Sequence, residues 1–226
     1  MTIETQDLGV FGYGYLMWKT GFEFVERRRA ALPGYIRRFC LDSITYRGTP
    51  EFPGLVLALD EEPGDRCEGV AFRVTAAERA KVHKYLRDRE LITYSYLEKF
   101  LDVDIEGGIR ARALCYVMDR SHQQYRGGLS PEAQAQVIAT AHGPAGSNIE
   151  YLMNTIEQLE AIGVDDPGMT QIGSSVSAIG LQSRGGSGGT TVVTGTVDVH
   201  PEAVWPATTI AAEMVRRTER EEGCIS

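Results

Sequence analysis

The chain has 226 residues, of which 42% are hydrophobic and 24% charged, and its formal net charge is −8. This size and composition predict a soluble globular protein with one sizeable core. The negative charge disfavours nucleic acid or an anionic membrane as a partner, and we interpret Arg27-Arg28-Arg29, the one basic cluster, as a solvated face. No stretch resembles a signal peptide or a membrane span, so we expect a cytoplasmic protein.

Short apolar runs bounded by turn residues predict β-strands. The first strand ends at Val10 and Phe11, where two glycines follow. Residues 60–65 separate two later runs and predict an antiparallel hairpin with a longer loop. The later predicted strands are residues 33–41, 55–59, 69–74, 93–104 and 110–118.

Capping patterns predict three helices. Thr75-Ala76-Ala77-Glu78 and Ser147-Asn148-Ile149-Glu150 are capping boxes, and Ser130 precedes a proline at a first helical position. The helices should run from residue 75 to about 91, from 130 to about 142 and from 147 to about 163. Strands that follow one another without helices are usually antiparallel. We therefore expect an α+β fold with a mostly antiparallel, curled or barrel-like sheet and packed helices.

The glycines after the first strand form a candidate binding turn. Gly12 and Gly14 permit backbone angles or close approaches that a Cβ would forbid, so N–H groups can face a ligand carboxylate or carbonyl oxygen. The same spacing also marks ordinary tight turns. A nucleotide loop is excluded, because Leu16-Met17-Trp18-Lys19 stands where a third glycine or a Gly-Lys-Ser/Thr would be needed.

Glu90 is the candidate acid. Val82, Leu86 and Glu90 are four residues apart, so they share one face of the first predicted helix. Burial on that face would raise the pKa of the carboxyl group toward the range useful for proton transfer. Alternatively, Glu90 ends the helix and pairs with Arg87 or Arg89 at the surface.

These stretches carry a resemblance to a known family. Phe11-Gly12-Tyr13-Gly14-Tyr15-Leu16-Met17-Trp18 resembles the Phe-Gly-Tyr-Gly-Ser-Leu-x-Trp signature of the ChaC-like, glutathione-specific γ-glutamylcyclotransferases. The resemblance covers about residues 8–165. Further blocks that agree in the same order are residues 37–39, 46–51, 53–57, 69–74, 85–90, 113–117 and 146–152.

The resemblance implies a γ-glutamylcyclotransferase-like fold and a reaction. The α-amino group of a γ-glutamyl unit attacks its own γ-carbonyl, which releases 5-oxoproline and, from glutathione, cysteinylglycine. Glu90 would be the general acid/base, and Arg47 and Tyr116 would help to hold the substrate. No metal or organic cofactor is required, since the nucleophile belongs to the substrate. The residues implied to bind the γ-glutamyl unit through their backbone are Phe11, Gly12, Tyr13, Gly14, Tyr15 and Leu16.

Two residues depart from the family pattern. Tyr15 stands where the signature has Ser, and Ser43 stands where some members have Asp. A bulky Tyr15 leaves two alternatives open beside glutathione cleavage. One is the same ring closure on other γ-glutamyl peptides or amines, and the other is a catalytically silent protein that binds γ-glutamyl ligands.

The remaining candidates predict no metal site and no disulfide framework. The cysteines at 40, 67, 115 and 224 lie far apart without a Cys-x-x-Cys pair, and the histidines at 83, 122, 142 and 200 are scattered and expected to face solvent. We expect a catalytic domain at residues 1–170 and a tail at 171–226. The tail contains a Gly/Ser-rich linker (183–190), a strand (191–199) and an amphipathic helix (208–222) of unassigned function.

Overall fold

The core of the protein is a closed barrel of five strands in the order β1-β3-β2-β4-β5. The computed structural model describes residues 6–184, with side chains as far as residue 181. Neighbouring strands are antiparallel, except that β1 and β5 pair in parallel and close the barrel. The mostly antiparallel, barrel-like α+β fold is therefore confirmed. The strands are β1 (Leu8–Gly12), β2 (Glu26–Ser43), β3 (Gly54–Val74), β4 (Tyr96–Ile105) and β5 (Ile109–Met118).

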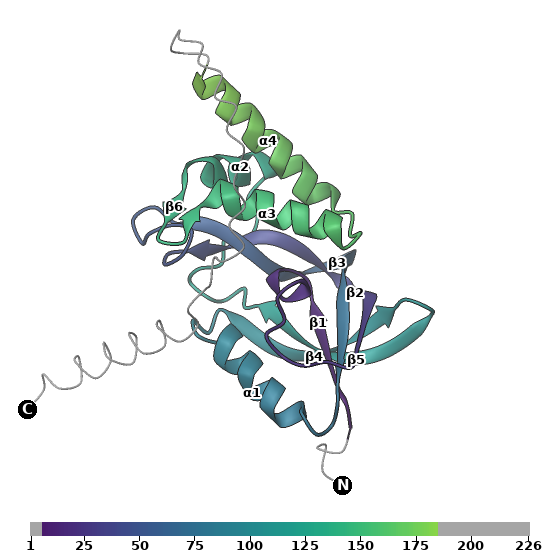
Figure 1. Cartoon of the computed structure of the whole chain (residues 1–226). Coiled ribbons are helices and arrows are strands. Elements are labelled where there is room, and N and C mark those ends of the chain that lie inside the picture. Colours follow the sequence, from purple (N-terminus) through teal and green to yellow (C-terminus); the bar gives the residue numbers. More distant parts are fainter. Residues whose placement is uncertain (1–5, 185–226) are drawn as a thin grey trace, which may run out of the picture. The chain divides into compact units, whose positions relative to one another are not determined.

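Helices cover the barrel on two opposite sides (Figure 1). Helix α1 lies on one side, and α2, α3 and α4 lie together on the other (Figure 1). None of the helices in the described residues is long and apolar enough to cross a membrane. The remaining elements are η2 (Tyr15–Met17), α1 (Arg79–Glu90), α2 (Pro131–Thr140), β6 (His142–Gly143), β7 (Gly146–Ser147), α3 (Asn148–Ala161) and α4 (Pro167–Arg184).

The hairpin predicted across residues 60–65 is wrong. Both of its arms belong to the single strand β3, and they pair with successive parts of β2 instead of with each other. The register shifts between Pro33 and Tyr35, at a bulge where Gly34 has a φ of +79° and the facing Gly64 a φ of +96°. Such a bulge bends paired strands without reversing them, and the reversal lies at residues 44–53 between β2 and β3.

Two of the three predicted helix starts are confirmed. The Ser130 and Ser147 side chains each accept a hydrogen bond from the backbone N–H of the third residue of their helix, Ala133 at 3.2 Å and Glu150 at 3.1 Å. The capping box at Thr75 is wrong, because α1 begins at Arg79 without a side-chain cap. The backbone N–H of Glu78 bonds to the carbonyl of Thr75 at 3.1 Å, so a turn precedes the helix.

Helix α4 was not predicted from the sequence. It buries Met169, Ile172 and Val176 against the same apolar cluster that takes in residues of the barrel and of α3. The helix continues through residue 170, where the sequence analysis ended the catalytic domain. Residues 183 and 184 of the expected linker belong to this helix. Outside the described residues lie the rest of the expected linker, the expected strand at 191–199 and the expected helix at 208–222.

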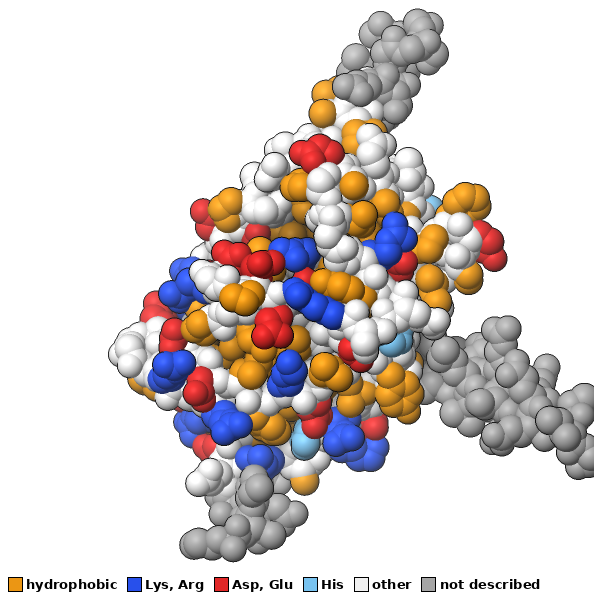
Figure 2. All heavy atoms as spheres, turned by 180° about the vertical axis from the view of Figure 1, so that it is seen from behind, with side chains coloured by type: hydrophobic (Ala, Val, Ile, Leu, Met, Phe, Trp, Pro, Cys, Tyr) orange, Lys and Arg blue, Asp and Glu red, His pale blue; other side chains and the backbone are white. Residues whose placement is uncertain are grey.

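The cysteines in the described part of the chain are core residues. Cys40, Cys67 and Cys115 are free and buried in the barrel. Burial raises the pKa of the Cys40 and Cys115 thiols to about 12 and that of Cys67 to about 11. On the surface, acidic and basic side chains are intermixed over the face shown in Figure 2. Arg27, Arg28 and Arg29 are exposed on β2, as expected for a solvated face.

Candidate active site

The glycine turn leaves the end of β1 and enters the short helix η2. Gly12 still pairs with Val70 of β3, and Gly14 accepts a hydrogen bond from the N–H of Met17 at 2.8 Å. Neither Gly12 nor Gly14 has a left-handed φ, so these glycines are not required by their backbone angles. Apart from its sequence neighbours, Gly14 has no atom of residues 6–181 within 4 Å of the position that a Cβ would occupy. The turn therefore presents bare backbone to open space.

Side chains of this turn point away from that space or into the core. Phe11 and Leu16 are buried in the apolar clusters, so only their backbone is left for a ligand. The Tyr15 ring packs beside Arg89 of α1, with 5.4 Å between the guanidinium carbon and the ring centroid. The ammonium of Lys19 lies 5.8 Å from the same centroid. The residue that departs from the family signature thus joins the turn to α1.

Glu90 is the last residue of α1 and lies on its inward face. Val82 and Leu86 on the same face are buried, as the spacing predicted, and the Glu90 side chain is 24% exposed. Burial raises the pKa of the Glu90 carboxyl group, and the positive charge of Arg89 opposes that rise. An oxygen of Glu90 lies 3.0 Å from Nε of Arg89, whereas Arg87 faces Glu98. Glu90 therefore faces inward and also has a cationic partner.

Three partly buried tyrosines are influenced by the charge of Glu90. Burial raises the pKa of the Tyr13, Tyr96 and Tyr151 hydroxyls, and the negative charge of Glu90 adds to the rise. Such an effect decays with distance, so these hydroxyls lie within electrostatic range of the carboxylate. The Tyr96 hydroxyl donates to the carbonyl of Leu57 at 3.2 Å, and the Tyr151 hydroxyl accepts from the N–H of Leu57 at 3.4 Å. Strand β3 thereby fixes tyrosines from β4 and α3 in the same region as the glycine turn.

Tyr116 lies in the next layer of this site. Its hydroxyl donates to the carboxylate of Glu98 on the neighbouring strand at 3.2 Å, and Nε2 of His83 lies 3.0 Å from the same carboxylate oxygen. Burial raises the pKa of Tyr116, and the charges of Glu98 and Glu90 raise it further. The expectation that His83 simply faces solvent is wrong, since α1 packs it against β4.

Arg47 reaches the site from the loop between β2 and β3. It is 8% exposed, and its Nη1 donates to the carbonyl of Ser147 at 3.1 Å and lies 3.3 Å from the Glu150 carboxylate. The guanidinium carbon is 5.6 Å from the centroid of the Tyr151 ring. Its Nε is buried and has no hydrogen-bond partner within residues 6–181. The hydroxyl of Ser43 accepts the Arg47 backbone N–H at 3.0 Å, so Ser43 holds this loop.

The expected site residues thus gather in one region, but not in one layer. The charge of Glu90 acts on Tyr13, which precedes Gly14 in the turn, and on Tyr151, whose ring lies beside Arg47. The charge of Glu90 also acts on Tyr116, but the Tyr116 hydroxyl is already hydrogen-bonded to Glu98. Sequence reasoning missed Tyr96, Tyr151 and Glu98. Tyr151 lies in one of the blocks that resemble the family, and that block was the signal available for it.

The fold belongs to the class of γ-glutamylcyclotransferase-like barrels. Two crystal structures of a yeast γ-glutamyl cyclotransferase specific to glutathione superpose on it with TM-scores of 0.68 and 0.65. Each covers 76% of this chain, and the chain covers 96% and 99% of the yeast proteins. Sequence identity is 23% and 24%, so this likeness speaks for the fold alone.

Sequence comparison gives the family. The model of the ChaC-like protein family matches residues 8–179. A glutathione-specific γ-glutamylcyclotransferase of Escherichia coli K12 is 36% identical over 170 residues, which are 75% of this chain and 73% of that protein. γ-Glutamylcyclotransferase 2-3 of Arabidopsis thaliana is 35% identical over 181 residues, covering 77% and 91% of the two chains. The chain belongs to the ChaC-like family, which confirms the resemblance seen in its sequence.

Proposed function

We propose that the protein is a γ-glutamylcyclotransferase that cleaves glutathione to 5-oxoproline and cysteinylglycine. The proposal depends on one observation, the inward carboxylate of Glu90, whose charge acts on Tyr13 next to the bare backbone at Gly14. Relatives named as glutathione-specific γ-glutamylcyclotransferases support the choice of substrate.

Glu90 is the proton carrier of the proposed reaction. As a carboxylate it takes a proton from the substrate's α-ammonium group, and the freed amine attacks the γ-carbonyl carbon. The new C–N bond closes the five-membered ring, the amide C–N bond to cysteine breaks, and Glu90 returns the proton to the departing nitrogen. The ring nitrogen then gives up its second proton, which the released amine of cysteinylglycine takes up to become an ammonium group. A raised pKa suits this exchange, because it brings the proton affinity of the carboxyl group closer to that of the groups with which it exchanges a proton.

Positive charge and backbone N–H groups hold the γ-glutamyl unit in this proposal. The buried Nε of Arg47 has no partner within the described residues, and a carboxylate of the substrate would supply an acceptor for it. The open backbone at Gly14 offers an N–H group to the γ-carbonyl oxygen, which becomes negative as the ring closes. Tyr116, whose hydroxyl donates to Glu98, borders the site and offers its hydroxyl oxygen to the substrate.

A comparison of two substrates tests the function. The protein is incubated with glutathione and with γ-glutamyl-alanine, and 5-oxoproline is measured from each. We expect product from glutathione. Product from γ-glutamyl-alanine alone would assign another γ-glutamyl substrate. Protection against heat by both compounds, without product from either, would identify a silent binding protein.

Glu90→Gln tests the mechanism. Glutamine has the shape of glutamate but cannot carry the proton, so we expect turnover to fall by at least about a hundredfold while the fold is retained. Asp88→Asn on the exposed side of α1 is the matched control and should keep wild-type turnover. Turnover of Glu90→Gln close to that of the control would remove Glu90 from the mechanism.

A further inference from the structure

Arg37 connects three segments that are distant in the sequence. Its side chain is 1% exposed and extends from β2. Nε donates to the carbonyl of Tyr13 in the glycine turn, and Nη2 donates to the carbonyl of Glu68 in β3 at 2.6 Å. Nη1 forms an ion pair with the carboxylate of Asp166. One buried guanidinium therefore joins the turn, the barrel wall and the start of α4.

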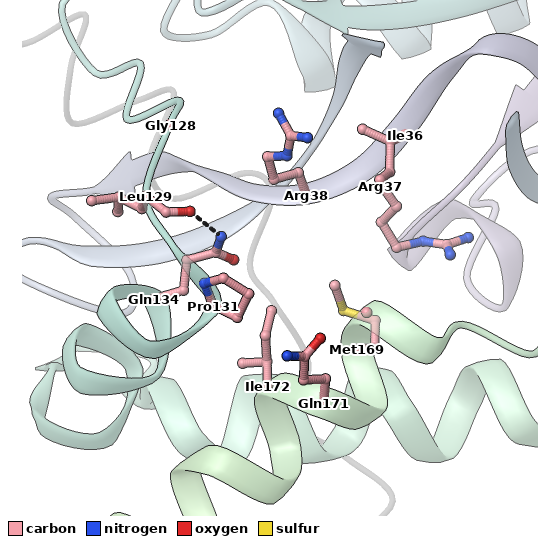
Figure 3. A pocket seen from close by; sticks show the side chains of 11 residues that line it. Ile36, Arg37, Arg38, Gly128, Leu129, Pro131, Gln134, Met169, Gln171 and Ile172 are labelled. Carbon is pink, nitrogen blue, oxygen red and sulfur yellow. Dashed lines mark hydrogen bonds between the residues drawn. The ribbon is translucent and has the colours of Figure 1, made fainter. Parts of the chain in front are cut away.

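Asp166 gives this guanidinium a fixed anchor. One of its carboxylate oxygens pairs with Arg37, and the other accepts the N–H of Met169 in the first turn of α4 at 3.1 Å. The helix in turn buries Met169 and Ile172, and Figure 3 shows both beside β2 at a cavity of about 300 Å³ that Arg37 also lines. Charge-assisted bonds in such a buried setting are among the strong ones in proteins.

The bond to Tyr13 determines where the next N–H group points. The peptide unit is planar and trans, so the carbonyl oxygen of Tyr13 and the N–H of Gly14 point in opposite directions. Fixing the carbonyl toward Arg37 therefore fixes the Gly14 N–H away from it. Among the described residues, no atom beyond the sequence neighbours of Gly14 lies within 4 Å of its Cβ position, so the turn is open on that side.

We propose that Arg37, anchored by Asp166, is a positioning residue that orients the Tyr13–Gly14 peptide so that the Gly14 N–H meets the substrate's γ-carbonyl oxygen. The inference deepens the proposed function and rests on it. It gives α4 an indirect role in the site, because the anchoring residue Asp166 directly precedes that helix.

Arg37→Lys tests the positioning role. Lysine keeps the charge near Asp166 but loses the planar fork that reaches two carbonyls as well. We expect KM for glutathione to rise and kcat/KM to fall by about tenfold or more, because the misplaced N–H no longer binds the γ-carbonyl oxygen of the bound substrate or the negative charge that develops on it. Hydrogen exchange of the backbone N–H groups at residues 12–16 should become faster. Asp166→Asn, which keeps an acceptor for the Met169 N–H, should change the same quantities less.

Arg38→Lys is the matched control. Arg38 is the next residue on β2, and it pairs with Asp60 at 3.0 Å and Glu62 at 2.9 Å without a bond to the turn. The Arg38→Lys substitution should leave KM for glutathione and the hydrogen exchange at residues 12–16 unchanged. A merely structural loss would reduce the amount of active protein at constant KM. Equal KM and equal exchange in the Arg37 and Arg38 variants would overturn the proposal.

Two further outcomes are also decisive. If Arg37→Lys does not fold, the Asp166→Asn variant tests the positioning role instead. Wild-type values of KM and of hydrogen exchange at residues 12–16 in that variant would overturn the proposal. If the wild-type protein makes no 5-oxoproline from glutathione, the proposed function fails by itself. Hydrogen exchange at residues 12–16 in Arg37→Lys then still shows whether Arg37 orients the turn.

Discussion

At the scale of single residues, Glu90 combines burial with charge. Its carboxyl group is largely surrounded by protein, and burial raises its pKa although Arg89 lies 3.0 Å away. A group whose pKa is higher in the folded state than in the unfolded state favours folding when protonated. That contribution is complete below the unfolded pKa and is lost as the pH rises through the folded pKa.

Glu90→Gln should therefore be more stable than the wild type at pH 8, because the neutral amide avoids the burial of a charge. The difference should shrink as the pH falls to about 3, below the unfolded pKa, where the wild-type carboxyl group is protonated in both states. Thermal unfolding at several pH values measures the effect. Asp88→Asn, on the exposed side of α1, should show no such trend. A variant less stable than the wild type at pH 8 would contradict the account.

Tyr15 is the second residue whose behaviour follows from its contacts. The ring packs against Arg89 and Lys19, so Tyr15→Ser should lower the free energy of unfolding by about 0.5–1 kcal/mol through the lost cation–π contact. Tyr15→Phe keeps the ring and should keep that stability. Denaturant unfolding checks both variants. We expect KM for glutathione to be nearly the same in all three proteins, and a much lower KM in Tyr15→Ser would mean that the ring crowds the substrate.

At the scale of elements, the sequence predicts what depends on neighbouring residues. The N-caps at Ser130 and Ser147 are local, and both helices begin where the sequence places them. The path of β3 depends on the long partner strand β2, which no local pattern reveals, and the predicted hairpin failed for that reason. Helix α4 was missed although Asp166-Pro167 carries an N-cap followed by a proline at the first helical position.

The two serine caps give a matched pair of variants. Ser130→Ala and Ser147→Ala should each lower the free energy of unfolding by about 1 kcal/mol, because each loses one cap hydrogen bond. Only Ser147→Ala should raise KM for glutathione, since the first turn of α3 holds Arg47 through the Ser147 carbonyl and Glu150. Urea unfolding and steady-state kinetics measure the two effects. Equal KM values in both variants would show that the first turn of α3 does not position Arg47 for substrate binding.

At the scale of the whole molecule, the candidate site is assembled across the barrel. Glu90 comes from α1 on one side, Tyr151 from α3 on the other and Tyr13 from the strand end between them (Figure 1). Glu90 was predicted from helical spacing, because its inward direction is a local property. The meeting of Tyr96, Tyr151 and Arg47 is set by barrel closure and by the docking of α3, so spacing in the sequence could not predict it.

The end of the catalytic unit can be tested by truncation. A chain that ends at residue 170 loses Ile172 and Val176, which are buried against the core cluster. At about 1.5–3 kcal/mol for each fully buried side chain, we expect it to be about 3–6 kcal/mol less stable than a chain that ends at residue 184. Chemical unfolding of the two truncated chains gives the difference. Equal stability would place α4 outside the catalytic unit.

The buried thiols of the barrel bear on how the protein tolerates its proposed substrate. Glutathione and its oxidised dimer modify proteins by thiol–disulfide exchange, which requires an accessible thiolate. With pKa values raised to about 11 or 12, fewer than about one in ten thousand of the groups at Cys40, Cys67 and Cys115 are ionised at pH 7. A change in redox balance would therefore alter the supply of reduced glutathione without modifying the thiols in the described part of the chain.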